Sequence, residues 1–219
     1  LVIQGMDFFA FDGPPSRLRT EYPEHLYGLG PTTFYKYFYD AYILKKMLTK
    51  TDWSTVFDSN QYAFDNDRFA AWGDRKKKPS YKKTVNSYFN PKYTRSYCSD
   101  AYDQESKESF RQNVVRIARE HPDTIFHLYY TPVSILDWLT REQLGDMEKL
   151  LEFRSFAAEE CQKLKNVRLY DFQSDKSITH NLKTYCDITH YDSSINELII
   201  REIHAGRYIT NPEKCKQAN

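Results

Sequence analysis

The chain has 219 residues, of which 40% are hydrophobic and 28% are charged, so it can bury a core and is not disordered as a whole. Its formal net charge of +1 gives no reason to expect a nucleic acid or an anionic membrane as a partner. Aromatic residues make up 16%, led by 18 tyrosines, a composition that suits either a Tyr-rich core and surface or a sugar-lined cleft.

The first half of the chain begins with an apolar run and then loses regularity. Residues 1–11 (LVIQGMDFFAF) predict a buried, central parallel strand that runs into a loop. Residues 12–30 are rich in Gly and Pro and predict a loop, and residues 31–49 predict a helix. Residues 50–105 have no clear period, so we interpret them as a long insertion and expect them to cover the strand ends as a lid.

The second half alternates helical and strand patterns. Helices are predicted over residues 107–120, 141–165 and 193–205, and strands over residues 124–130 and 167–172. In the first of these helices Phe110, Val114, Ile117 and Ala118 share one face. Ser194 and Glu197 have capping-box spacing at the start of the last helix, and Gly206 suits the position after its end.

This alternation predicts one α/β domain over residues 1–219, a three-layer α/β/α sandwich with a mainly parallel sheet and a long insertion after the first strand. Residues 1–5, 124–130 and 167–171 should be neighbouring or near-neighbouring strands. Ligands of such sheets bind at the carboxyl ends of the strands. Three segments should therefore meet there: residues 5–7, 130–134 and 171–191.

The segment with the clearest chemistry is Tyr185-Cys186-Asp187-Ile188-Thr189-His190-Tyr191, between the last strand and the last helix. An Asp three residues before a His can hold one imidazole nitrogen and leave the other as a general base. Asp187 and His190 would then be the supporting pair of a nucleophile–His–Asp triad. The spacing alone is a weak pattern, which an ordinary loop or helix cap also produces.

A wider pattern surrounds this pair, in Tyr170-Asp171-Phe172, residues 178–182, residues 185–191 and residues 193–203. It resembles the SGNH (GDSL-like) hydrolase and acyltransferase superfamily, and within it the SGNH-like proteins of bacterial surface-polysaccharide loci. The D-alanyl transfer proteins and the alginate O-acetyltransferase partners are more distantly similar proteins of the same kind. The resemblance covers about residues 107–210 and the opening strand, does not cover residues 50–105, and implies an SGNH or flavodoxin-like fold.

The resemblance also implies two elements that this sequence does not show. The family's nucleophilic Ser lies in a Gly-Asp-Ser-like block upstream of every segment matched here, and the chain has no Gly-x-Ser-x-Gly elbow. Because the sequence starts inside a predicted strand, we expect the natural protein to continue upstream, with the serine and any targeting segment there. The family's Gly-x-Asn-Asp block supplies an oxyanion donor, but here Gly5 is followed by Asp7, and an ionised Asp cannot donate.

Other residues are weaker candidates. Tyr129, Tyr130 and Ser134 flank a strand end where a substrate could bind, although strand termination alone explains them, and His180 neighbours the Asp187–His190 segment. His127 lies among apolar residues and is interpreted as a core histidine. The cysteines Cys98, Cys161, Cys186 and Cys215 include no Cys-x-x-Cys pair, so a zinc ribbon is disfavoured and disulfide pairing stays open. No metal and no cofactor are expected.

Two functions from different classes follow. The first is a serine-dependent esterase or O-acyltransferase that acts on acyl esters of a carbohydrate or a cell-surface polysaccharide. The alternative is a non-catalytic SGNH-like domain that binds a glycan or a partner protein of a polysaccharide assembly system. The resemblance implies the bacterial cell envelope or periplasm, with membrane anchoring through an upstream segment as an option. The oligomeric state is not determined by the sequence.

Overall fold

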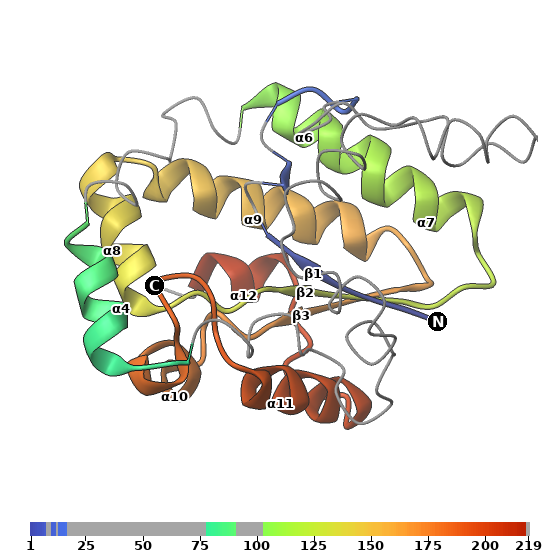
Figure 1. Ribbon diagram of the computed structural model, residues 1–219. Helices are drawn as coiled ribbons and strands as arrows, with labels where there is room; N and C mark the ends of the chain where they lie inside the picture. The colour runs from blue at the N-terminus through green and yellow to red at the C-terminus, as the bar shows by residue number, and fades with distance from the viewer. Residues whose placement is uncertain (8–9, 12, 17–77, 91–102, 218–219) are drawn as a thin grey trace, which may run out of the picture. The chain divides into compact units, whose positions relative to one another are not determined.

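The computed structural model describes residues 1–7, 10–11, 13–16, 78–90 and 103–217, all of which belong to one compact unit (Figure 1). These residues form a mixed α/β structure around a small parallel sheet. The helix predicted over residues 31–49 and most of the predicted insertion, including the greater part of the expected lid, lie outside the described residues. None of the helices in the described part of the chain is both long and apolar enough to cross a membrane.

The sheet has three parallel strands in the order β1-β2-β3: β1 (Val2–Met6), β2 (Phe126–Tyr130) and β3 (Val167–Asp171). Val2 pairs with Phe126, and Tyr130 pairs with Asp171. The prediction that these segments are parallel neighbours in one sheet is therefore confirmed. Because all three strands run in the same direction, Met6, Tyr130 and Asp171 lie together at the carboxyl ends of the strands.

The expectation that the first strand is buried was wrong for its middle, where Ile3 is 40% exposed. Among the described residues β1 is the outer strand of the three, and its central position in a larger sheet stays a prediction. An apolar run indicates a strand, but it does not show which side of that strand another strand or helix covers.

One long helical region precedes β2. It consists of α6 (Gln104–Phe110), a π-helical segment (Arg111–Val115) and α7 (Arg116–Glu120). The predicted helix over residues 107–120 is thus present, with a changed inner face: Val115 is buried, whereas Ile117 is 37% exposed. A π turn inserts one extra residue into the helix, so the residues that face the core no longer follow the α-helical spacing.

Two helices replace the single helix predicted over residues 141–165. They are α8 (Ile135–Leu144) and α9 (Met147–Gln162). Gly145 separates them, with a left-handed φ of 75° that ends α8. The prediction was wrong because the apolar pattern continues across this glycine, whereas the helical backbone conformation ends there.

Shorter elements follow β3. They are α10 (Lys176–Thr179), a 3₁₀ turn (Leu182–Thr184), α11 (Ser193–His204) and α12 (Pro212–Gln217). Asp192, and not Ser194, caps α11, because its Oδ1 accepts a hydrogen bond from the Ser194 amide at 3.0 Å. Gly206 has the left-handed φ of 69° expected after the end of this helix.

A helix also lies within the predicted insertion. Helix α4 (Tyr81–Tyr88) packs on the 3₁₀ turn and on α8, although no helical period was recognised in its sequence. The buried Thr84 hydroxyl donates to the Tyr185 carbonyl at 2.8 Å. At least this part of the insertion therefore supports the segment that carries Asp187 and His190.

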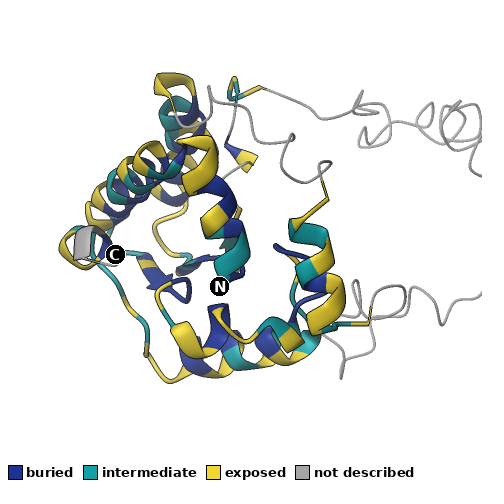
Figure 2. Cartoon of the chain, turned by 90° about the vertical axis from the view of Figure 1, so that its left-hand side faces the viewer, coloured by how far each residue is buried: buried dark blue, intermediate teal, exposed yellow. Residues whose placement is uncertain are grey.

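Two hydrophobic clusters account for the packing of the sheet. One includes Leu128 and Tyr130 of β2 together with residues of α9, and the other includes Tyr170 of β3 and Ile199 of α11. In Figure 1, α9 and α11 lie on opposite sides of the strands, and Figure 2 shows the buried positions on the inner sides of the helices. The helices that cover the sheet thus leave the carboxyl ends of its strands to the connecting loops.

Candidate active site

The loop that carries the Asp187–His190 pair is a tight turn held at several points. Tyr185 and Tyr191 form an antiparallel bridge, and the Cys186 amide donates to the His190 carbonyl at 2.7 Å. The Ile188 side chain is fully buried. These contacts fix the backbone on both sides of the pair before any ligand is bound.

A second set of contacts attaches this loop to the segment that follows β2. The Ile188 carbonyl accepts hydrogen bonds from the Ser134 hydroxyl at 2.7 Å and from the Ser134 amide at 3.0 Å. The Tyr185 hydroxyl donates to the Pro132 carbonyl at 3.3 Å. The loop is therefore attached to the carboxyl end of β2, as the strand order predicted.

The hydrogen bond expected between Asp187 and His190 is present. Nδ1 of His190 lies 2.8 Å from Oδ1 and 2.9 Å from Oδ2 of Asp187. The Asp187 side chain is 3% exposed, whereas that of His190 is 59% exposed. The buried carboxylate is therefore the fixed member of the pair, and the imidazole is the member that a substrate can reach.

The electrostatics of Asp187 determine the tautomer of His190. Burial alone would raise the pKa of Asp187, but hydrogen bonds from the His190 side chain and amide and from the Thr189 amide outweigh it and hold the pKa well below its usual range. An ionised Asp187 only accepts hydrogen bonds, so Nδ1 of His190 carries the proton. In the neutral imidazole Nε2 then has the lone pair that a general base needs.

Two tyrosines lie beside the pair. Tyr191, next to His190 in the chain, is hydrogen-bonded to Tyr129 of β2, and both are close enough to Asp7 for its charge to affect them. Burial is the main cause that raises the pKa of each phenol, and the negative charge of Asp7 adds to it. Both hydroxyls thus stay protonated at neutral pH, and because Tyr191 donates to Tyr129, the Tyr129 proton is the one left for another acceptor.

Gly5 makes room for this arrangement. A Cβ atom at Gly5 would lie 2.9 Å from the Tyr129 hydroxyl and 2.9 Å from Oγ1 of Thr131, closer than real Cβ contacts come. Asp7 is exposed, beyond the end of β1. Gly5 therefore lies against Tyr129 and Thr131, and the charge of Asp7 reaches Tyr129 and Tyr191.

Two of the weaker candidates do not face a substrate site. Tyr130 is fully buried, and its hydroxyl donates to the Arg154 carbonyl at 2.7 Å. Ser134 is also fully buried, with its hydroxyl bound to Ile188. Side chains alternate along a strand, so Tyr129 lies on the side of Tyr191, and Tyr130 lies in the core with α9.

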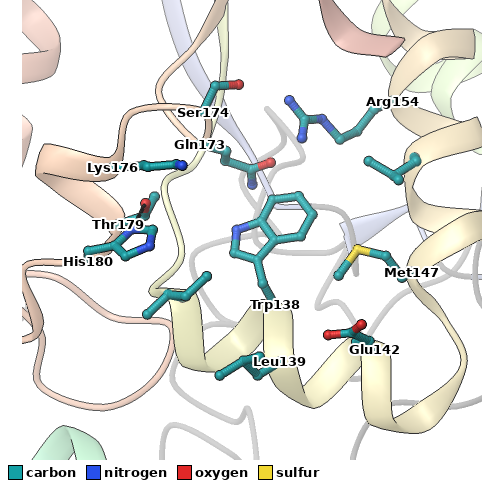
Figure 3. Close-up of a pocket in the computed structure, with 12 residues that line it drawn as sticks. Trp138, Leu139, Glu142, Met147, Arg154, Gln173, Ser174, Lys176, Thr179 and His180 are labelled. Atoms are coloured by element: carbon teal, nitrogen blue, oxygen red, sulfur yellow. Dashed lines mark hydrogen bonds between the residues drawn. The ribbon is translucent and has the colours of Figure 1, made fainter. Parts of the chain in front are cut away.

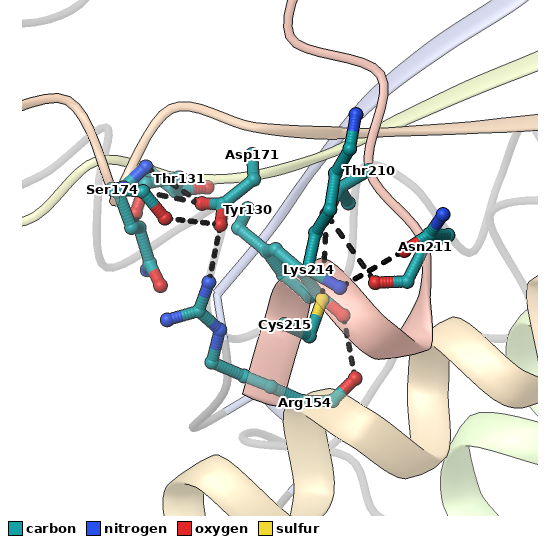
Figure 4. A network of polar contacts seen from close by, with 10 residues as sticks. Tyr130, Thr131, Arg154, Asp171, Ser174, Thr210, Asn211, Lys214 and Cys215 are labelled. Carbon is teal, nitrogen blue, oxygen red and sulfur yellow. Dashed lines mark hydrogen bonds and ion pairs between the residues drawn. The ribbon is translucent and has the colours of Figure 1, made fainter. Parts of the chain in front are cut away.

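A buried polar network lies at the end of β3 (Figure 4). Arg154 of α9 donates to Oδ2 of Asp171 at 2.6 Å, and the Ser174 hydroxyl donates to the same oxygen at 2.5 Å. Oδ1 of Asp171 accepts a hydrogen bond from the backbone N–H of Gln173 at 2.9 Å. The network fixes the start of the loop that leads from β3 to α10.

Next to this network is a cavity of about 480 Å³ between α8, α9 and α10 (Figure 3). His180 is exposed and lines it, so this candidate belongs to the cavity wall. Trp138, Arg154 and Gln173 line it as well, and none of the three was singled out from the sequence. These three residues are far apart in the sequence, so no short motif could have indicated them.

Models of known protein families, curated proteins and solved structures were all compared with this chain, and none matches. The likeness to SGNH proteins therefore stays a resemblance in motifs.

The remaining predictions on chemistry-bearing residues concern His127 and the cysteines. His127 is partly buried, and its Nδ1 lies 2.7 Å from the Tyr170 hydroxyl, so its polar partner is identified. Cys161, Cys186 and Cys215 are buried, and no disulfide joins any two of them, whereas Cys98 lies outside the described residues. In the described part of the chain no three His, Cys, Asp or Glu side chains gather as a metal site would require.

Proposed function

We propose that this protein is a serine-dependent esterase or O-acyltransferase whose general base is His190, oriented by Asp187. The observation that carries the proposal is the buried, ionised Asp187 bound to Nδ1 of an exposed His190. A histidine whose Nδ1 is held by a carboxylate can use its other ring nitrogen as a general base, which is the arrangement of the supporting pair in acyl transfer.

The reaction would proceed in two steps. A serine hydroxyl attacks the acyl carbonyl while Nε2 of His190 takes the hydroxyl proton and returns it to the leaving alcohol. Water or a sugar hydroxyl then attacks the acyl-serine, with His190 again moving the proton, and the serine is released. Asp187 stabilises the imidazolium that forms in both steps and stays ionised throughout.

The serine, the substrate and the complete fold come from the resemblance. The serine would lie in a block upstream of this sequence, the acyl group on a carbohydrate or surface polysaccharide, and the protein in the bacterial cell envelope. The three parallel strands would belong to a three-layer α/β/α sheet with further strands. The protonated Tyr129 hydroxyl, which accepts from Tyr191 and keeps its own proton, is the candidate to donate to the oxyanion in place of the family's Asn.

The test uses the full-length natural protein and a fluorophosphonate probe, which labels an activated serine. We expect the wild-type protein to be labelled at one serine and His190→Ala to lose labelling and the hydrolysis of an acetylated sugar by a factor of about 10³ or more. His204→Ala is the matched control, because His204 is exposed on α11 and lies outside the loop.

The melting temperature of each variant shows whether it is folded, and the exposed position of His190 predicts little change. Labelling at an unchanged rate in folded His190→Ala would contradict the proposal. A full-length protein in which no serine reacts would instead support a glycan- or partner-binding domain.

A further inference from the structure

The cavity between α8, α9 and α10 presents a hydrogen-bond donor that the protein itself does not use. Trp138 lines this cavity, and its indole N–H donates to no acceptor among the described residues. The buried polar atoms without a partner in this part of the chain belong to Arg154 and Gln173, so the indole N–H is not shut away from the cavity. An indole nitrogen is a donor only, and a ligand bound to it there must therefore present an acceptor.

A cation without a partner lies on the same flank of the cavity. The exposed ammonium of Lys176, the first residue of α10, forms no ion pair with a described carboxylate. Figure 3 shows the indole nitrogen of Trp138 on the side where Lys176 and His180 lie. An ammonium and an indole N–H are both donors, and one negatively charged acceptor can bind to both of them.

The charges of the wall favour an anion with a single negative charge. Glu142 of α8 lines the opposite flank and has no cationic partner in the described part of the chain. The other cation of the wall, Arg154, is already paired with Asp171. A carboxylate would balance the charge of Lys176, whereas a phosphate dianion would add a second negative charge in the same cavity as Glu142.

The remaining lining is mainly apolar. Ile135 and Leu139 come from α8, and Met147 and Leu151 come from α9. Together with the ring of Trp138 they form a surface that an alkyl or aryl group would cover, which is favourable because both surfaces leave water. The cavity volume of about 480 Å³ lies in the range of small-molecule sites.

From these observations we propose that the cavity binds an apolar monocarboxylate. The carboxylate accepts a hydrogen bond from the Trp138 indole and pairs with Lys176, while the hydrocarbon part packs against the apolar side chains of α8 and α9. The assignment goes beyond the proposed ester chemistry and does not rest on it, because no bond is made or broken when the ligand binds.

The test is an NMR titration of the full chain labelled with ¹⁵N-tryptophan, with the Trp138 indole resonance assigned from Trp138→Phe. The probes are hexanoate and phenylacetate. Hexanol, which lacks the charge, and acetate and inorganic phosphate, which lack the apolar part, are the comparisons. We expect both probes to shift the Trp138 resonance saturably at a Kd of about 1 mM, and each comparison to bind at least about tenfold more weakly.

Two exposed residues of the wall separate the contribution of the charge from that of the apolar surface. Lys176→Met should weaken hexanoate about tenfold, because it removes the cation. Leu139→Asn should weaken hexanoate several-fold and reduce its advantage over acetate. Lys183→Met is the matched control: Lys183 is exposed on the neighbouring 3₁₀ turn and does not line the cavity, so the Kd should not change.

The melting temperature of each variant shows whether it is folded, and the exposure of the substituted side chains predicts little change. Three outcomes would overturn the proposal: no saturable shift with either probe, hexanol or phosphate binding as tightly as hexanoate, or an unchanged Kd in folded Lys176→Met. The first outcome would leave solvent as the partner of the Trp138 indole. The second would show that the cavity does not recognise a charge and an apolar group together.

Discussion

The His190 loop and the Trp138 cavity lie at the same edge of the sheet, but they are assembled in different ways. In the loop, donor and acceptor are three residues apart, and the hydrogen bonds that orient them come from the same turn. In the cavity, Trp138, Arg154 and Gln173 come from α8, α9 and the loop after β3. A local arrangement leaves a motif in the sequence, whereas an arrangement between distant elements does not.

The two regions also differ in how they hold a charge. Asp187 is buried and compensated within its own turn, and its partner His190 is exposed. Arg154 and Asp171 are both buried, and their partners come from different elements. Changes in the loop should therefore affect chemistry more than stability, and changes in the polar network should do the reverse.

The largest effect is expected for Asp187→Asn on ester turnover in the full-length protein. An Asn can hold His190 in the wrong tautomer, so turnover should fall by a factor of about 10⁴, measured with an acetylated sugar. Asp192→Asn is a matched control, since Asn caps a helix as well as Asp does and α11 should be unaffected.

The same variant should also change how the stability of the protein depends on acidic pH. The folded pKa of Asp187 lies below its ordinary value of 3.8, so its contribution to stability is present above about pH 4 and is lost as the pH falls below it. Asp187→Asn should flatten that part of the stability profile. Full ester turnover in the folded Asp187→Asn variant would contradict the expectation that changes in the His190 loop affect chemistry more than stability.

Arg154→Met should have the largest effect on stability. It leaves Asp171 buried without its cationic partner, which costs about 3–5 kcal/mol in the free energy of unfolding, measured by urea denaturation. Arg116→Met is the control: Arg116 pairs with Glu120 at 3.1 Å on the surface of α7, and such pairs contribute about 0–1 kcal/mol. Equal losses in the two variants would mean that burial does not distinguish these ion pairs.

Ser134→Ala should have an intermediate effect. It removes the hydroxyl bond to Ile188 but keeps the amide bond, so unfolding should become easier by about 1 kcal/mol. Ester turnover should fall less than in Asp187→Asn, because the loop would be displaced but the pair retained. Ser87→Ala, which removes a bond within α4 only, should leave turnover unchanged.

The smallest effect concerns the pH dependence of Tyr208, which donates to Asp175 at the start of α10. This bond is the main cause that raises the pKa of Tyr208 from 10.0 to about 12. A raised folded pKa stabilises the protein below pH 10, and this contribution is lost as the pH rises from 10 to 12. Tyr208→Phe should remove that alkaline loss, and an unchanged profile between pH 9 and 12 would contradict the assignment.

Much of the fold could be predicted because it follows from local pattern. The three strands, the helical region before β2 and α11 are regular amphipathic or apolar runs, whose period is visible in the sequence, whereas the short α12 after them was not predicted. The errors lie where one residue changes the backbone or where burial depends on a neighbour. Gly145 divides one apolar pattern into two helices, and the π segment at Arg111–Val115 changes which residues face the core.

The sequence by itself determined the Asp187–His190 pair, because both partners and the turn that orients them lie within one short segment. Only the tertiary structure decided that Tyr130 and Ser134 are buried while Tyr129 approaches Tyr191, since this depends on the helix that covers each face of the sheet. It alone also placed Arg154 and Gln173 in one cavity wall with Trp138. A cavity is the space that several elements leave between them, and no single segment encodes that space.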